Sequence, residues 1–244
     1  MQVGVYCSSI RPYFWDNLYK MLSNNDVDFN LCIAGPYSSE KPLPSNVKYI
    51  QTNVKPPQCW FIAAQNTAGD YVMSIEDDST HSPGSLDDLV KLVDGKMTLA
   101  SPKYSRIIDC GGSHYDFADK RVGKVKKQRK IITLDFPLPV NAMMHRDTFN
   151  DIGIDKNFIG VYWILDISFE LVSRGGKIII SETSVISDFK TSGLCKSGGD
   201  YEYLTDMWFD GDEVRSKRKQ PIDPLVYGDD VLIVSQGRRH PKWP

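Results

Sequence analysis

The run of residues 69–78 constrains the fold more than any other part of the chain, because an apolar strand leads directly into three consecutive carboxylates. Side chains alternate along a strand, so Glu76 and Asp78 are expected on one side and Asp77 on the other. Two carboxylates on one side can share a hard cation such as Mn²⁺ or Mg²⁺. We therefore predict a divalent metal site at Glu76 and Asp78. The alternative is an acidic turn that is simply solvated.

Helical patterns flank this run on both sides. Residues 58–68 are expected to form a helix that stops at Gly69, and Pro83-Gly84 precedes a second one. Apolar periodicity also predicts strands over 2–7, 29–34 and 47–50 and a helix over 13–22. The first 95 residues then follow the order β-α-β-β-α-β-α, which predicts an open α/β sheet with mostly parallel strands and ligands at their carboxyl ends.

The rest of the chain is less regular. Short strands are expected over 97–102, 107–110, 140–145, 177–180 and 183–187, and helices over 146–152 and 164–173. Residues 119–130 hold seven basic residues and one acid, which is typical of a solvated loop or helix face. A last strand is expected over 231–234. We predict a domain over 1–190 and a C-terminal extension over 191–244 that packs on the core or caps it.

Composition narrows the class of protein. With 244 residues the chain can bury a full core, and its formal charge of −2 disfavours nucleic acid as a partner. The five cysteines are scattered without a C-x-x-C pair, so neither a disulfide framework nor a zinc site is indicated. Neither a secretory leader pattern nor an apolar stretch of membrane-spanning length is seen, and we expect a cytoplasmic protein without a membrane span.

Two blocks of sequence resemble the GT-A glycosyltransferases, particularly the family-2-like group. The first is 66–72 with Glu76-Asp77-Asp78 and 83–86, and the second is 140–149 followed by 152–155 and 166–178. The small size and the opening Ser-Ile-Arg-Pro are also similar to glycosyltransferases of large algal viruses (chloroviruses). The resemblance implies a GT-A, Rossmann-like sheet flanked by helices. For a viral member it implies the host cytoplasm as the location.

The resemblance also implies an activity, namely transfer of a sugar from a nucleotide diphosphate donor, a UDP-sugar, to a hydroxyl of a glycan or glycoprotein acceptor. A bound Mn²⁺ or Mg²⁺ would neutralise charge on the departing diphosphate. Ser8, Ser9 and Arg11 lie where the family's first strand meets the nucleotide. The alternative is that Ser9 and the residues up to Pro12 only cap the following helix. Asp77 is expected to accept a hydrogen bond from the ribose or donor sugar, or else to cap a turn. Where family members often carry an acid that helps to bind the base, this chain has Gly35-Pro36.

Three further residues take roles from the same resemblance. Asp166 is the candidate catalytic base, because Trp163-Ile164 stands where inverting members carry an acidic pair. Its alternative role is a helix cap. Asp188 is a candidate third metal ligand, or else a surface acid, and Lys190 is a candidate phosphate contact, or else solvated.

Two other functions remain open on the sequence. A sugar-nucleotide pyrophosphorylase uses a similar sheet, but it needs a Gly-rich loop where this chain has Ser8-Ser9-Ile10-Arg11. A non-catalytic nucleotide- or carbohydrate-binding module would explain the missing acidic pair before Asp166.

Overall fold

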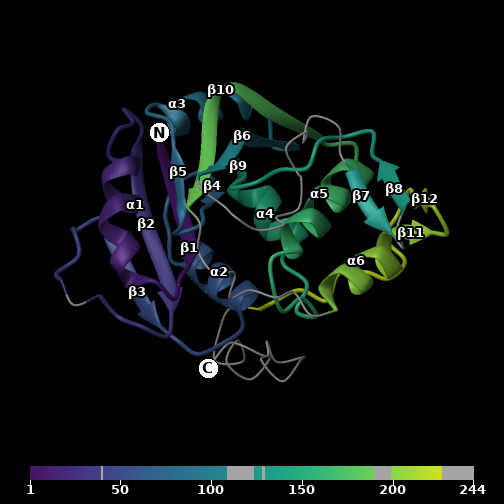
Figure 1. Cartoon of the computed structure of the whole chain (residues 1–244), viewed down its shortest axis with the longest axis horizontal. Helices are drawn as coiled ribbons and strands as arrows, with labels where there is room; N and C mark the ends of the chain where they lie inside the picture. The colour runs from purple at the N-terminus through teal and green to yellow at the C-terminus, as the bar shows by residue number, and fades with distance from the viewer. Residues whose placement is uncertain (40, 109–123, 128–129, 190–198, 227–244) are drawn as a thin grey trace.

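The computed structural model describes residues 1–39, 41–108, 124–127, 130–189 and 199–226 (Figure 1). Its centre is an eight-stranded sheet with the order β3-β2-β1-β4-β9-β6-β10-β5. The strands of this sheet are β1 (Gln2–Ser8), β2 (Asp28–Gly35), β3 (Val47–Gln51), β4 (Tyr71–Ser74), β5 (Ser79–His81), β6 (Thr98–Ile108), β9 (Met143–His145) and β10 (Lys177–Phe189).

The sheet is mixed and mostly parallel. β1 pairs in parallel with β2 and β4, and β2 pairs in parallel with β3. Short β9 runs antiparallel between β4 and β6, β10 lies parallel to β6, and β5 closes the edge antiparallel to β10. The carboxyl ends of β1, β2 and β4 therefore meet at one edge, as the sequence predicts.

Helices cover both faces of this sheet (Figure 1). Alternate residues of β1 show the division, since Val3, Val5 and Cys7 enter one buried cluster and Tyr6 enters the other. The first cluster includes residues of α1 (Trp15–Leu22) and α3 (Ser85–Leu92). The second includes residues of α2 (Pro56–Gln65), α4 (Arg146–Ile152), α5 (Trp163–Ser173) and α6 (Asp200–Trp208). A one-turn 3₁₀ helix, η1 (Pro12–Phe14), precedes α1.

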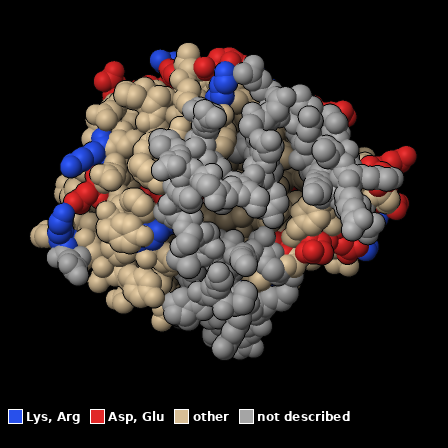
Figure 2. Space-filling model, viewed as in Figure 1, with Lys and Arg blue, Asp and Glu red and all other residues tan. Residues whose placement is uncertain are grey.

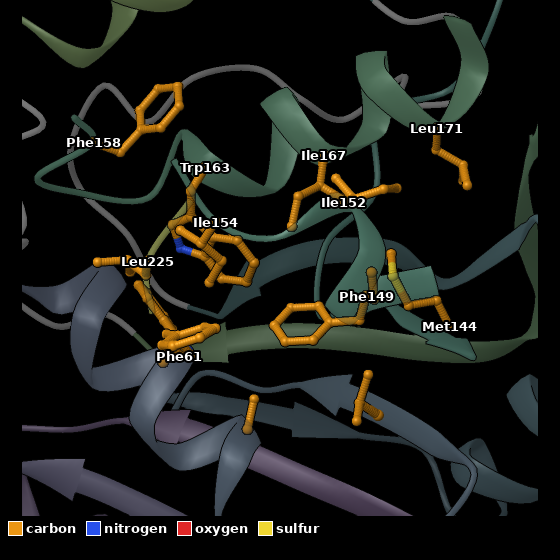
Figure 3. Packing of buried hydrophobic residues seen from close by; sticks show 14 of the residues in the cluster. Phe61, Met144, Phe149, Ile152, Ile154, Phe158, Trp163, Ile167, Leu171 and Leu225 are labelled. Carbon is orange, nitrogen blue, oxygen red and sulfur yellow. The ribbon is translucent and has the colours of Figure 1, made fainter. Parts of the chain in front are cut away.

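The C-terminal segment contributes to the second cluster. Leu204, Met207 and Trp208 of α6 are buried in it, and so is Leu225. Figure 3 shows Leu225 in the same cluster as Phe61 of α2 and Trp163 of α5. Two short strands, β11 (Phe209–Asp210) and β12 (Glu213–Val214), follow α6 as a hairpin. The described residues 199–226 thus pack on the core, while the boundary at residue 190 stays a prediction.

Several predicted elements have different bounds in the structure. The strands expected over 97–102 and 107–110 are one strand, β6, and those expected over 177–180 and 183–187 are one strand, β10. The register of β10 shifts between Ile180 and Val185, so the intervening polar residues break the apolar pattern without ending the strand. Part of the basic segment forms a hairpin, β7 (Lys124–Lys127) and β8 (Lys130–Thr133), instead of a loop or helix. Residues 231–234 lie outside the described residues.

The described surface carries both signs of charge. In the view of Figure 2, Lys and Arg side chains and Asp and Glu side chains both occur along the parts of the rim that are not grey. Across the described part of the chain, no helix is both long and apolar enough to cross a membrane.

Candidate functional site at the carboxyl edge of the sheet

The site lies where β1 and β4 end side by side. Ser9 N donates to Ala34 O at 3.0 Å, which fastens the start of the loop after β1 to β2. Ile75 N donates to Tyr6 O at 3.0 Å, which continues the pairing of β4 with β1 beyond Ser74. These backbone bonds bring residues 9–11 beside the acidic turn, defined here as residues 76–78.

Arg11 joins the loop to the acidic turn. Its guanidinium forms an ion pair with Asp78, with Nη1 2.7 Å from Oδ2, and its Nη2 pairs with Asp77 Oδ1. Ser9 completes the connection, because its hydroxyl donates to Asp77 Oδ2. Trp15 Nε1 then donates to the Ser9 hydroxyl at 2.8 Å, and Arg11 N donates to it at 3.1 Å. Both carboxylate oxygens of Asp77 therefore accept hydrogen bonds from the protein itself.

Burial differs sharply along the acidic turn. The Asp77 side chain is 1% exposed, whereas the side chains of Asp78 and Arg11 are 16% and 17% exposed. Burial raises the pKa of Asp77, and Arg11 opposes this rise. Burial also disfavours the charged guanidinium, but the two carboxylates outweigh it and raise the pKa of Arg11 above its ordinary value. The turn thus contains a buried ion pair and, beside it, a second pair that solvent can reach.

The expected alternation of the acidic residues needs correction. β4 ends at Ser74, so Asp77 and Asp78 lie in a turn and both reach the same guanidinium. The alternation of side chains along a strand does not apply to a turn. The Asp77 side chain points into the protein, where it accepts a hydrogen bond from Ser9. The structure gives Asp77 a role in positioning Arg11 and Ser9 that the sequence did not predict. A direct contact of Asp77 with the donor stays a prediction.

The end of β10 approaches the same turn. Asp188 pairs in register with Ser79 of β5, and Phe189 N donates to Asp78 O at 2.7 Å. The fold therefore brings the backbone of Asp188 next to the predicted metal ligands, 110 positions along the chain from Asp78. The Asp188 side chain and all of Lys190 lie outside the described residues. Their roles stay predictions.

Asn141 contacts β5, the strand that follows the acidic turn, and was not singled out from the sequence. Its Nδ2 donates to Ser79 Oγ at 3.0 Å and lies 3.1 Å from His81 Nε2. Its φ of +47° is in the left-handed region, which Asn tolerates better than most residues. Burial lowers the pKa of His81 to about 4, so this imidazole is neutral at pH 7. The one sequence signal for this position is the residue type, because asparagine is common where the backbone has a positive φ.

Ser8 ends β1 in a half-buried position, and its side chain lies near the thiol of Cys59 on α2. Ser8 and Ser9 thus face different neighbours, and in the structure Ser9 and Arg11 contact the acidic turn. Arg11 also precedes η1, but no side-chain hydrogen bond caps that helix or α1. The alternative role of Ser9 as a helix cap is therefore wrong.

Asp166 lies on α5 within a second, fully buried charge network. Its Oδ1 accepts hydrogen bonds from Trp208 Nε1 at 2.7 Å and from Arg218 Nε at 3.0 Å. Arg218 also forms an ion pair with Asp155, and the side chains of all three charged residues are at most 3% exposed. Burial raises the pKa of Asp166 to about 6, and Arg218 opposes this rise. These contacts anchor the C-terminal segment to α5, and the assignment of Asp166 as a base stays a prediction.

The acidic turn suits a divalent cation chemically. Glu76 and Asp78 are half-buried carboxylates, which supply the hard oxygen ligands that Mn²⁺ and Mg²⁺ prefer. Among the described residues no group of three His, Cys, Asp or Glu side chains gathers as a metal site. Two described carboxylates therefore fit the ion, and a third protein ligand from Asp188 stays a prediction.

The eight-stranded, mostly parallel sheet with helices on both faces is the GT-A glycosyltransferase fold, which confirms the predicted fold class. Among solved structures, the chain is similar to residues 1–349 of S. aureus TarS, with a TM-score of 0.60 at 14% identity. The same part of TarS in complex with UDP-GlcNAc gives 0.61 at 13% identity, and its complex with UDP gives 0.60 at 13%.

These matches cover 84% of this chain and 64% to 65% of the TarS segment, so the chain spans less than two thirds of it. At such low identity the similarity establishes the fold alone. No protein-family model matches the chain, and no curated protein matches it. The similarity to glycosyltransferases of algal viruses stays a prediction.

Proposed function

We propose that this protein is a glycosyltransferase that moves a sugar from a UDP-sugar to a hydroxyl of a glycan or glycoprotein acceptor. The observation that carries the proposal is the contact of Arg11 with the acidic turn at the carboxyl edge of a GT-A sheet. Ligands of open α/β sheets bind at this edge. The crystal structures of TarS with UDP and UDP-GlcNAc support a uridine nucleotide as the donor.

The residues at this edge supply what a diphosphate donor needs. Arg11 offers a planar guanidinium, which binds phosphate oxygens through paired hydrogen bonds. Ser8 and Lys190 are the further donor contacts of the proposal, and Glu76, Asp78 and Asp188 are its metal ligands. A bound Mn²⁺ or Mg²⁺ would act as a Lewis acid toward the charge that develops on the departing diphosphate.

Asp166 is the candidate base in this proposal. Its pKa of about 6 leaves the carboxylate largely ionised at pH 7, which is the form that a general base needs. Asp166→Asn should then lower turnover by at least about 100-fold while UDP affinity is kept. Asp151→Asn, an exposed acid paired with Arg174, is the control. Unchanged turnover in Asp166→Asn would place the base elsewhere.

Thermal-shift and calorimetric titrations with UDP, other nucleoside diphosphates and a panel of UDP-sugars test the donor class. A nucleotide that binds only the folded protein raises its melting temperature. We expect UDP to stabilise the protein more than CDP, GDP or ADP, and one UDP-sugar to be consumed with release of UDP. If none of the four nucleotides binds, the proposed function is wrong.

A second candidate is a non-catalytic module that binds a nucleotide or carbohydrate. The buried ion pair of Asp166 with Arg218 favours it, because a carboxylate that anchors a C-terminal segment need not take part in chemistry. UDP binding without consumption of any UDP-sugar, with and without Mn²⁺, would support the module and count against the transferase.

A further inference from the structure

We propose that Arg11 and a divalent cation compete for the Asp78 carboxylate, so that a metal ion binds the acidic turn well only when a diphosphate takes over the guanidinium. In this proposal the Arg11 guanidinium neutralises Asp78 when no metal ion is bound, and nucleotide and metal bind cooperatively. The part of this inference that concerns the diphosphate rests on the proposed function. The competition for Asp78 stands on the contacts of Arg11 alone.

Arg11 is held firmly on one side. Its Nη2 pairs with the buried Asp77, and its guanidinium lies 5.8 Å from the ring centroid of Phe14. Phe14 in turn stacks on Phe189 of β10, with ring centroids 5.5 Å apart and planes 6° apart. The backbone of Phe189 also donates to Asp78 O. The guanidinium is thus fixed between a carboxylate and an aromatic ring, and its position is linked to that of the acidic turn.

The two ion pairs of Arg11 differ in how readily they exchange. Breaking the pair with Asp77 would leave a charge uncompensated at a side chain that is 1% exposed. Asp78 is 16% exposed, so water or a cation can replace the guanidinium there at much lower cost. Asp78 is also the predicted metal ligand. Competition is therefore expected at Asp78, while Arg11 remains on Asp77.

Charge explains why metal and diphosphate would cooperate. A divalent ion on Asp78 stands close to the guanidinium, and two cations at this separation repel each other strongly in a partly buried site. The negative charge of a bound diphosphate would offset this repulsion. Because linkage is reciprocal, metal must then strengthen nucleotide binding by the same factor by which nucleotide strengthens metal binding.

The test measures binding, with Mn²⁺ alone and UDP alone as probes. In calorimetric titrations of the wild-type protein we expect weak binding of Mn²⁺ alone and measurable binding of UDP in EDTA. Arg11→Gln should bind Mn²⁺ about tenfold more tightly, since the competing charge is gone, and should bind UDP in EDTA about tenfold more weakly. Arg174→Gln is the matched control, because Arg174 also pairs with two acids, Asp151 and Glu170, and should change neither affinity.

A double variant keeps the test valid if Arg11→Gln does not fold. Arg11→Gln with Asp77→Asn removes the buried charge together with its partner and leaves Asp78 in place. Tighter Mn²⁺ binding by a folded single or double variant supports the competition, and unchanged or weaker Mn²⁺ binding overturns it. If Mn²⁺ binds more tightly but UDP binds no form of the protein, the competition holds and the proposed function fails.

Discussion

Ser9 and Asp77, 68 positions apart in the chain, are joined by a hydrogen bond from the serine hydroxyl to Asp77 Oδ2. Ser9 follows β1 and Asp77 follows β4, so this bond connects the carboxyl ends of two adjacent strands. Trp15 at the start of α1 donates to the same hydroxyl. The position of Arg11, two residues after Ser9, therefore depends on a buried network that includes a strand end, a turn and a helix.

Ser9→Ala is expected to destabilise the protein by about 1–3 kcal/mol, because it leaves the buried Trp15 indole and one Asp77 oxygen without this partner. Urea unfolding measures the change. Ser23→Ala removes an exposed hydroxyl that bonds only locally to Tyr19 O, and it should change stability by less than about 0.5 kcal/mol. Equal effects of the two substitutions would show that the Ser9 network contributes little.

Gly35→Ala should disturb the loop after β1. A Cβ at Gly35 would lie 1.8 Å from Ser9 O, a backbone atom that cannot move without shifting the loop. We expect a loss of about 1–3 kcal/mol or more in stability and weaker UDP binding. Gly95→Ala is the matched control, because a Cβ there meets nothing within 4 Å. If Gly35→Ala has the same UDP affinity and the same free energy of unfolding as the wild-type protein, the contact between Gly35 and Ser9 O does not limit the size of residue 35.

Asp78→Ala tests the metal assignment. The side chain is partly exposed and Arg11 keeps its pair with Asp77, so the free energy of unfolding should change by less than about 1 kcal/mol. Calorimetry with UDP and Mn²⁺ together should show at least about tenfold weaker binding, which corresponds to about 1.4 kcal/mol. The exposed Asp16→Ala, which removes a pair with Lys41, should leave binding unchanged. Wild-type affinity in Asp78→Ala would refute the metal assignment.

Asp166 should make stability depend on pH. Burial raises its pKa to about 6 in the folded protein, above roughly 3.9 in an unfolded chain. Between these values the folded state binds more protons than the unfolded state, so the contribution of Asp166 to the free energy of unfolding falls as pH rises from about 4 to about 6. The size of the fall is roughly 1–3 kcal/mol.

Comparison of the wild-type protein with Asp166→Asn isolates this contribution. Urea unfolding of both proteins at pH 4 and pH 7 gives the difference in their free energies of unfolding at each pH. From pH 4 to pH 7, the wild-type protein should lose more stability than Asp166→Asn. Asp151→Asn, which is exposed, should follow the wild-type protein. A wild-type-to-Asp166→Asn difference that is the same at both pH values would show that Asp166 titrates normally.

Much of the first half of the fold could be predicted because its signals are local. Apolar periodicity and the glycine and proline breaks around 35–36, 69 and 83–84 predict β1 to β4 and α1 to α3 close to where the structure has them. The same signals miss β5, which is only three residues long, and they divide β10, whose irregular middle is polar, into two strands. Short or interrupted strands are held by hydrogen bonds to neighbouring strands of the sheet. A pattern of a few residues cannot show which segments will become those neighbours.

By itself, the sequence determined the order of the elements in the first 95 residues except the three-residue strand β5, and it placed the carboxylates just after a central strand. Both follow from patterns within a few residues of each other. Only the tertiary structure decided the partners of those carboxylates. Arg11 meets Asp77 across 66 positions, and Arg218 meets Asp155 and Asp166 across 63 and 52. Such pairs depend on how whole segments pack, and packing also decides which of these charges are shielded from solvent.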